Sequence, residues 1–408
     1  MLGTARSVGT LLLAIFMLMS GGGFLATLIS LRLEAAGWPA LIIGLVATAY
    51  FVGLTVGSIL AFSVVARVGH IRAFAAFVSL FSATSLAYSI HLDPLFWSLL
   101  RLTDGFCMAG VFVCLESWLN ERAESETRGS ILAFYMIALY AGQAIGQFLL
   151  NVGDEWPSMP FIAASILLSL SVLPISLTRI AAPPPPEGSI MRLSRLYRAS
   201  PLGVIGAGTT GVMLGAFYGL GAVFARGAGL RDAGTALFMS ATILGGVALQ
   251  WPLGRLSDLI DRRKVIFAGF LATLGICAAI FWWAEGRHQL MLAGALFGGA
   301  CFALYPLCVA HTNDHLRSDQ RVAATGGLVL IYSLGAAAGP LPAAAVMDGA
   351  GAHGLFLFIG VCAAVVVIFA SVRLWSTPPV PGERQRRYLI LPRTTPVAAK
   401  LDPLSPED

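Results

Sequence analysis

Long apolar stretches alternate with short polar segments along almost the whole chain. A helix needs about 20 apolar residues to cross a hydrocarbon core about 30 Å thick, and every stretch reaches that length. The pattern therefore predicts twelve membrane-spanning helices. Their expected ranges are 8–31, 40–65, 72–91, 95–119, 128–150, 159–178, 202–225, 234–256, 264–284, 288–311, 322–347 and 353–375. The first stretch lacks an Ala-x-Ala cleavage site, so we expect it to be retained as a helix.

Two segments interrupt this pattern and define the expected organisation. Between the sixth and seventh stretches lie four consecutive prolines followed by arginines, a composition typical of a stiff linker. After the last stretch the chain turns rich in Pro and Arg, which predicts a disordered tail. We therefore expect an N-terminal six-helix half at 1–178, a cytoplasmic linker at 179–200, a C-terminal six-helix half at 201–375 and a cytoplasmic tail at 376–408.

The two expected halves share a repeat about 193 residues apart. The matching segments are Asn120-Glu121 with Asn313-Asp314, Ser125-Glu126-Thr127-Arg128 with Ser318-Asp319-Gln320-Arg321, and Gly142 and Gly146 with Gly335 and Gly339. A repeat of about half the chain length indicates duplicated halves. The predicted fold class is an all-α polytopic membrane protein with twelve transmembrane helices in two pseudo-symmetric six-helix halves.

The composition agrees with a membrane protein. Hydrophobic residues make up 57% of the chain, charged residues 12%, and the mean hydropathy is +0.81, whereas soluble domains are about 25% charged. The net charge of +5 does not indicate nucleic-acid binding, because the basic residues lie between apolar stretches. With the N-terminus inside, the outer segments hold only Arg32, Arg226, Arg231 and Arg287. This bias predicts that both termini are cytoplasmic.

One loop, between the eighth and ninth stretches, carries the most specific motif. Gly254 allows two helices to approach, and Asp258 lies four residues later on the same helix face, where Arg262 and Arg263 can pair with it. The loop resembles the signature of the major facilitator superfamily, Gly-x-x-x-Asp-x-x-Gly-Arg-Arg/Lys. Asp261 replaces the second Gly, and Ala66 replaces the Asp of the first-half loop. The resemblance implies a conformational latch formed by Gly254, Asp258, Arg262 and Arg263.

Further motifs extend the resemblance over nearly the whole chain. Arg101-x-x-x-Gly105 is similar to a motif of the family's fourth helix, whose Arg is often linked to proton coupling. The paired glycines of stretches five and eleven resemble the antiporter motif of helix five. The segments that resemble the YcaD-like branch of bacterial transporters are Gly69-His70-Ile71-Arg72, Glu116-Ser-Trp118-Leu-Asn120-Glu121-Arg122 and Tyr305-Pro306-Leu-x-x-x-His311-x-Asn313-Asp314-His315. The resemblance implies a multi-pass protein of the bacterial inner membrane that works as a monomer.

Charged side chains within the stretches are costly in a bilayer, so they are functional candidates. Arg101 and Asp104 lie three residues apart on one helix face and can pair, and Glu116 lies one turn from the inner end. We expect these three as the proton-coupling candidates. Arg101 and Asp104 can instead form a structural ion pair. Glu116 can instead be a solvated helix end, or a gate that pairs with Arg122 or Arg128.

Uncharged polar and aromatic side chains are candidates for the wall of a central cavity. Gln143 and Gln147, four residues apart, present two amides on one face, and lipid would leave these amides without partners. Further cavity candidates are Tyr50, Tyr140, Tyr218, Gln250, Trp251, Tyr305 and Tyr332. Such a wall suits a neutral, amphipathic or weakly ionised organic solute.

Several kinds of chemistry have no sequence support. The sequence contains no phosphate loop, no His-Glu-x-x-His and no Gly-x-Ser-x-Gly. His311 and His315 lie four residues apart, and we interpret them as a polar helix end rather than a metal site. We therefore predict no enzyme activity, no cofactor and no metal.

Three functions fit this pattern. The first is a secondary transporter driven by protons, which exports a drug or metabolite. The second keeps the fold and moves a lipid or lysolipid. The third is a non-transporting sensor or assembly partner that signals through the linker and tail. The partners expected for the first are a small-molecule substrate, a proton and the bilayer.

Overall fold

The computed structural model describes residues 2–123, 126–153, 156–178, 183, 191–283, 286–376, 378–381, 385, 387–395 and 397. Its helices are α1 (Leu2–Gly22), α2 (Leu25–Ala35), α3 (Ala40–Val68), α4 (His70–Ala87), α5 (Pro94–Arg122), α6 (Arg128–Gly146), η1 (Gln147–Gly153), α7 (Met159–Ser176), α8 (Leu193–Ala199), α9 (Pro201–Gly227), α10 (Asp232–Leu259), α11 (Arg262–Trp283), α12 (Arg287–Asn313), η2 (Ser318–Gln320), α13 (Arg321–Ala338), α14 (Pro340–Ala350) and α15 (Gly354–Ser376). In these residues, 12 helical segments are long and apolar enough to cross a membrane. The predicted all-α, twelve-span fold is confirmed.

Three of the spans are broken into two helical segments. They run over Val8–Ala35, Arg128–Gly153 and Arg321–Ala350. The first break lies where the chain passes close to α6, since a Cβ on Gly23 would lie 3.0 Å from Cγ of Gln143. The last break precedes Pro340, which lacks an amide hydrogen and fits the first turn of a helix. The sequence pattern predicted each of these spans as one continuous helix.

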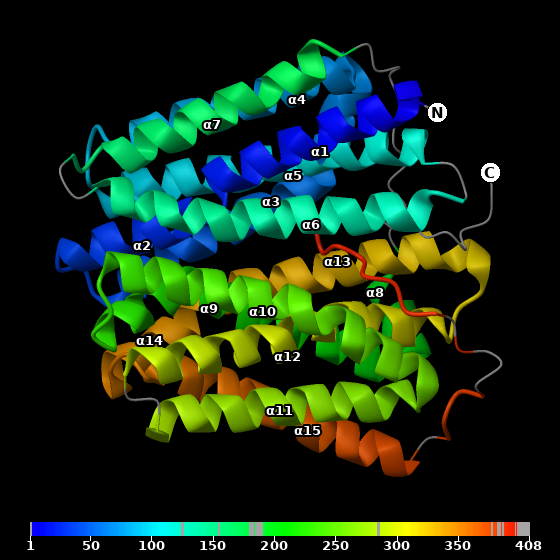
Figure 1. Ribbon diagram of the computed structural model, residues 1–408. Coiled ribbons are helices and arrows are strands. Elements are labelled where there is room, and N and C mark those ends of the chain that lie inside the picture. The colour runs from blue at the N-terminus through cyan, green and yellow to red at the C-terminus, as the bar shows by residue number, and fades with distance from the viewer. Residues whose placement is uncertain are drawn as a thin grey trace.

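The two halves pack through the same pairs of helices (Figure 1). The contacts of α3 with α5, α1 with α6 and α4 with α7 return as α10 with α12, α9 with α13 and α11 with α15. The repeated glycines lie in these contacts. A Cβ on Gly142 would lie 2.5 Å from the carbonyl oxygen of Phe16 in α1, and one on Gly335 would lie 2.2 Å from that of Gly208 in α9. Small residues let the helix backbones approach, as they do in other membrane bundles.

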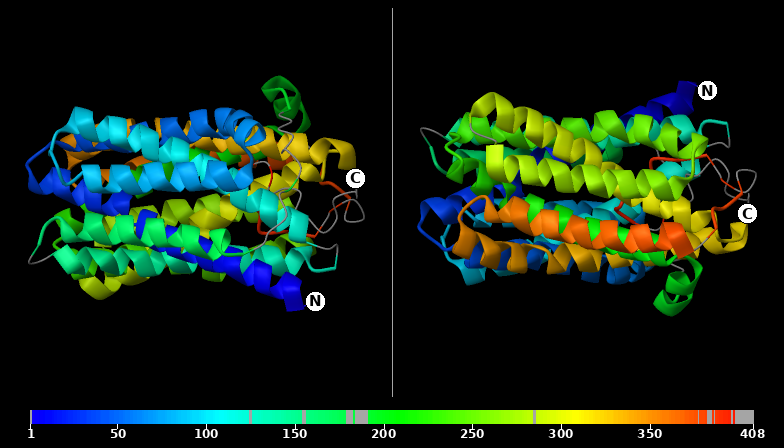
Figure 2. Two further views of the ribbon diagram at one scale, coloured as in Figure 1. Left: turned by 90° about the horizontal axis from the view of Figure 1, so that it is seen from above. Right: turned by 90° about the horizontal axis from the view of Figure 1, so that it is seen from below.

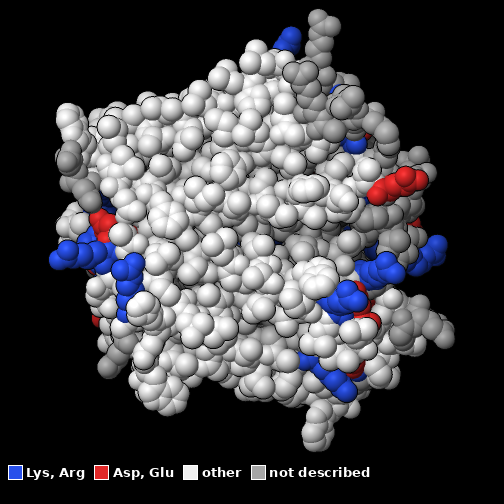
Figure 3. Space-filling view, viewed as in Figure 1, with Lys and Arg blue, Asp and Glu red and all other residues white. Residues whose placement is uncertain are grey.

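The bundle has two distinct ends. We call the end with α8 and the C-terminal residues the linker end, and the end with α2 and α14 the opposite end (Figures 1 and 2). On the face shown in Figure 3, charged side chains gather at both ends and leave an uncharged band between them. Such a band is what a bundle needs to lie in hydrocarbon. Because of the positive-inside bias, we predict that the linker end faces the cytoplasm.

The C-terminal residues depart from the expectation of disorder where the structure describes them. Residues 387–395, which we call the tail segment, run from the linker end in between the two halves, as the red trace in Figure 1. Leu391 and Thr395 are buried there. The reason is that the tail segment carries apolar and aromatic side chains, which are buried in the cavity between the halves. The prolines 184–186 of the expected linker and residues 398–408 lie outside the described residues.

Candidate functional site

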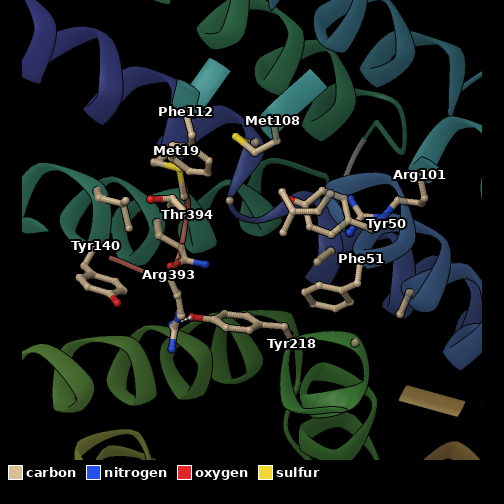
Figure 4. Close-up of a pocket in the computed structure, with 18 of the residues that line it drawn as sticks. Met19, Tyr50, Phe51, Arg101, Met108, Phe112, Tyr140, Tyr218, Arg393 and Thr394 are labelled. Carbon is tan, nitrogen blue, oxygen red and sulfur yellow. Dashed lines mark hydrogen bonds between the residues drawn. The ribbon is translucent and has the colours of Figure 1, made fainter. Parts of the chain in front are cut away.

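A cavity lies at the seam between the two halves (Figure 4). Its walls come from α1, α2, α3, α5 and α6 on one side and from α9 and α13 on the other. The candidate wall residues that line it are Tyr50, Tyr140, Gln143, Tyr218 and Tyr332. Residues 392–394 of the tail segment complete the lining, and the space left beside them is about 150 Å³.

Four candidate wall residues lie elsewhere. Gln147 is buried on η1, where its amide nitrogen lies 3.4 Å from the carbonyl oxygen of Gly23. Gln250 donates to the carbonyl oxygen of Phe302 at 3.3 Å, and the Tyr305 ring packs on Tyr332 at 5.1 Å. Trp251 is 61% exposed and is not among the residues that line this cavity. It follows the buried Gln250, and successive residues point about 100° apart around a helix.

Sequence reasoning missed part of the wall. The additional wall residues include Met19, Phe51, Met108, Phe112 and Met136. Met108 and Phe112 lie four residues apart on α5, the helix that also carries Arg101, and this spacing was the available signal. Methionine is a flexible apolar residue that adapts to differently shaped ligands. The wall is therefore more apolar and more adaptable than the amide-rich wall we predicted.

Arg101 and Asp104 form a buried ion pair on α5, in the part of this helix that is nearer to the opposite end of the bundle. Arg101 Nη1 lies 3.8 Å from Asp104 Oδ2, and the guanidinium carbon lies 4.1 Å from the centre of the Tyr50 ring. Asp104 also accepts hydrogen bonds from the hydroxyls of Thr84 and Tyr88, the latter at 2.6 Å. Both donors belong to the α4 region. Asp104 thus ties α5 to its neighbour, while Arg101 reaches the cavity wall.

Glu116 lies on the same helix about three turns further toward the linker end. Its side chain is fully buried, and at 1.5 Å per residue it is about 18 Å along the axis from Asp104. Oε1 of Glu116 accepts a hydrogen bond from the Tyr135 hydroxyl at 2.7 Å. The hydroxyls of Thr394 and Thr395 in the tail segment also donate to this carboxylate. The three coupling candidates therefore occupy two separate places.

The predicted latch is a network of ion pairs at the linker end. Arg262 is buried, and its guanidinium lies 2.8 Å from Asp258 and 2.6 Å from Asp314. Arg263 pairs instead with Asp261, at 2.6 Å. Burial would raise the pKa of Asp261, but the side-chain and backbone hydrogen bonds from Arg263 outweigh it and hold this pKa below its usual value. The departure from the family motif at this position thus supplies a second ion pair.

The tail segment contacts the residues of the predicted latch. The amide nitrogen of Tyr388 donates to Asp258 Oδ1 at 2.8 Å. A Cβ on Gly254 would lie only 2.0 Å from Cδ1 of Tyr388, so the Tyr388 ring packs directly against the Gly254 backbone. Asn120 Nδ2, at the end of α5, donates to the carbonyl oxygen of Val397 at 2.7 Å. Val397 lies just beyond the tail segment, whose Thr394 and Thr395 also donate to Glu116 of α5, so the C-terminal residues contact both halves.

Two repeated six-helix halves with a cavity at their seam form the architecture of a secondary transporter. The family model described as Major Facilitator Superfamily matches residues 11–242 and 202–395. The chain belongs to the major facilitator superfamily. It is 30% identical over 381 residues to an uncharacterized MFS-type transporter YcaD of Salmonella enteritidis PT4 (strain P125109), and equally to that of Salmonella typhi. Each match covers 91% of this chain and 97% of the relative.

Solved transporters share the fold at low sequence identity. The nucleoside transporter NupG superposes with a TM-score of 0.75 at 13% identity, covering 93% of this chain and 100% of that one. A bacterial homologue of the human lysosomal transporter Spinster, inward-facing and occupied, gives a TM-score of 0.71 at 15% identity over 93% of this chain and 96% of that one. Together with the twelve spans, the family membership makes this chain a multi-pass bacterial membrane transporter.

Proposed function

We propose that the protein moves a small organic solute by alternating access, coupled to protons and working as an exporter. The observation that carries this proposal is the cavity at the seam, with walls from both halves and a carboxylate within reach. Export is the direction that the antiporter-like glycine pairs of α6 and α13 support. We place the transporter in the inner membrane as a monomer, with both termini in the cytoplasm.

The contacts between the halves support access from the linker end in this conformation. At the opposite end Ser30 Oγ donates to the carbonyl oxygen of Gly219 at 2.7 Å, and Arg226 Nε lies 3.7 Å from Glu34 Oε2. Asp348 of α14 accepts from the first amides of α3. At the linker end the tail segment enters between the halves. Rocking of the halves would break the first set of contacts and open the cavity to the other side.

Glu116 is the residue best placed to carry the coupled proton. It lies between the linker end and the cavity, and its carboxylate takes hydrogen bonds from Tyr135 and from the tail segment. A carboxylate whose hydroxyl partners change during rocking can take up and release a proton. Arg101 and Asp104 are held together and to Thr84 and Tyr88, an arrangement that suits positioning of α5.

Proton flux in proteoliposomes tests the proposal. Solutes that raise the Tm of the purified protein in a metabolite and drug screen are added to vesicles with a pH gradient, and solute-driven proton movement is recorded. We expect flux in the wild type and loss of at least about a hundredfold in Glu116→Gln, the lower end of what loss of an acid–base group costs. Glu121→Gln is the matched control, because Glu121 is an exposed carboxylate at the end of the same helix. Solute movement without proton flux, or equal flux in both variants, contradicts the assignment.

A further inference from the structure

Arg393 of the tail segment lies in the cavity beside Tyr218 (Figure 4), and three aromatic rings, which we call the cage, surround its guanidinium group. Its guanidinium carbon lies 4.7 Å from the ring centre of Phe302, 5.5 Å from that of Tyr332 and 5.9 Å from that of Tyr218. Nη2 of Arg393 also donates to the Tyr218 hydroxyl at 3.3 Å. Aromatic faces attract cations within about 6 Å of the ring centre. The three rings therefore form a binding site for one positive charge.

The cage belongs to the helical bundle and not to the tail. Tyr218, Phe302 and Tyr332 come from α9, α12 and α13, three helices of the C-terminal half. Phe302 and Tyr332 are almost fully buried, and the Phe302 ring also packs at a tilt against Tyr140 and Tyr218, with ring centres 6.0 and 6.1 Å apart. The cage rings therefore pack against other side chains of the bundle and not only against the tail segment.

A carboxylate lies next to the cage. Thr394 and Thr395 follow Arg393 directly and donate to Glu116, and neighbouring Cα atoms are about 3.8 Å apart. Glu116 comes from α5 in the N-terminal half. A ligand that replaced residues 393–395 would thus meet aromatic faces on one half and an acidic group on the other. Both features favour a cation over a neutral or anionic group.

The cavity as described has little room for a further ligand. Sites for small molecules usually have about 300–1,000 Å³, and the space beside residues 392–394 is about 150 Å³. Cargo of ordinary size therefore has to displace the tail segment. The segment is a tethered competitor, and a short tether gives it an effective concentration on the order of millimolar.

We propose that Tyr218, Phe302 and Tyr332 bind the cationic group of the cargo, an organic guanidinium or amine, and that Arg393 occupies this cage as a built-in competitor. The proposal rests on the proposed transport function, and its substrate class is organic cations instead of the neutral or weakly ionised solutes expected from the sequence. Release of the tail segment uncovers the cage and Glu116 together. The cargo then binds by displacing Arg393 from the cage.

Binding of a matched pair of probes to the purified full-length protein tests the proposal. Phenylguanidine is a cation at neutral pH, and phenylurea has the same shape without the charge. By isothermal titration calorimetry we expect Arg393→Gln to bind phenylguanidine at least about tenfold more tightly than the wild type, because its open form is more populated. Arg387→Gln is the matched control and should behave as the wild type, since Arg387 is exposed on the same segment.

The cage itself is tested in the Arg393→Gln background. Tyr332→Leu removes a ring face and should weaken phenylguanidine binding about tenfold, which corresponds to one desolvated cation–π contact. Tyr332→Phe keeps the ring and should lose less. Arg393→Lys keeps a positive charge on the segment and should keep the site closed, which separates competition from any damage to the fold.

Two results would overturn the proposal. One is equal binding of phenylguanidine to Arg393→Gln, Arg387→Gln and the wild type. The other is equal binding of phenylguanidine and phenylurea to Arg393→Gln. Because these measurements need no transport, they are independent of the proteoliposome experiment. Cation binding without proton flux would refute the coupling, and proton flux with a neutral solute but no cation binding would refute the cage.

Discussion

At the scale of single residues, α5 carries two acidic groups with different partners. Asp104 is enclosed by Arg101, Thr84 and Tyr88, so its hydrogen bonds are made within the N-terminal half. Glu116 contacts Tyr135 of the same half and hydroxyls of the tail segment. A group whose partners stay in one half keeps them during rocking, whereas Glu116 has partners that can leave. The structure therefore favours a structural role for Asp104.

Asp104→Ala should lower the free energy of unfolding by about 1–3 kcal/mol, the cost of leaving buried donors without an acceptor. The affected donors are Arg101, Thr84 and Tyr88. The measurement is SDS or thermal unfolding of the purified protein. Thr103→Val is the control, since the Thr103 hydroxyl donates to Leu99 of its own helix. If Asp104→Ala unfolds like the control, Asp104 does not hold α4 and α5 together.

Which residues form the site was only partly predictable from the sequence. Charged residues in the spans stood out because a bilayer makes them rare. Trp251 does not line the cavity, and an apolar stretch alone does not tell which face of its helix points to a cavity. Arg393 was missed because it lies outside every span, in a segment read as disordered. The signal was there as Tyr388-Leu-Ile-Leu391, an apolar run within a polar tail.

At the scale of elements, the hydrophobic pattern predicted the spans within a few residues. The stretch 40–65, for example, corresponds to α3, Ala40–Val68. The breaks between α1 and α2 and between α13 and α14 were not predicted, because hydropathy stays high across them. They depend on contacts between helices, such as that of Gly23 with Gln143. Periodicity along one helix carries no information about such contacts.

The repeated helix pairs make a prediction about packing. Gly105 of α5 and Gly298 of α12 each face a backbone carbonyl, and a Cβ would lie 2.0 Å from that of Tyr50 and 1.8 Å from that of Thr242. Gly105→Val and Gly298→Val should each destabilise the protein by at least about 1–3 kcal/mol, the usual cost of overpacking. Thermal unfolding in detergent measures the effect. Gly275→Ala should be nearly neutral, since a Cβ there meets nothing within 4 Å.

At the scale of the whole molecule, the internal repeat predicted two similar halves and a cavity at their seam. Both are observed, because the repeated motifs lie in the repeated helix contacts. The conformation was not predictable, since one sequence must support every state of a transport cycle. The state described here has several contacts between the halves at the opposite end, among them Ser30 with Gly219 and Glu34 with Arg226. None of these four residues belongs to the segments that repeat between the halves, so the repeat does not predict the contacts.

Loss of the Asp348 contact should shift the equilibrium between the state that is closed at the opposite end and the state that is open there. The N-cap position of α3 is Pro39, which provides no side-chain acceptor, and Asp348 of the other half accepts from the amides of Ala40 and Leu41 at 3.0 and 3.2 Å. A capping carboxylate is worth about 0.5–2 kcal/mol, which corresponds to a population ratio of about 2 to 30. Asp348→Ala should therefore raise the ratio of molecules open at the opposite end to molecules closed there by such a factor.

Distances between spin labels at the opposite end measure this shift. Ser89→Cys and His288→Cys place labels at exposed positions on the two halves, in a Cys362→Ser background because Cys362 is partly exposed. Asp93→Ala is the control, because Asp93 caps α5 within one half by accepting from Phe96 at 2.8 Å. It should lower stability without lengthening the distance between labels. If Asp348→Ala and Asp93→Ala give the same distance distribution, the cap holds α3 but not the closed state, and closure then depends on the Glu34–Arg226 and Ser30–Gly219 contacts.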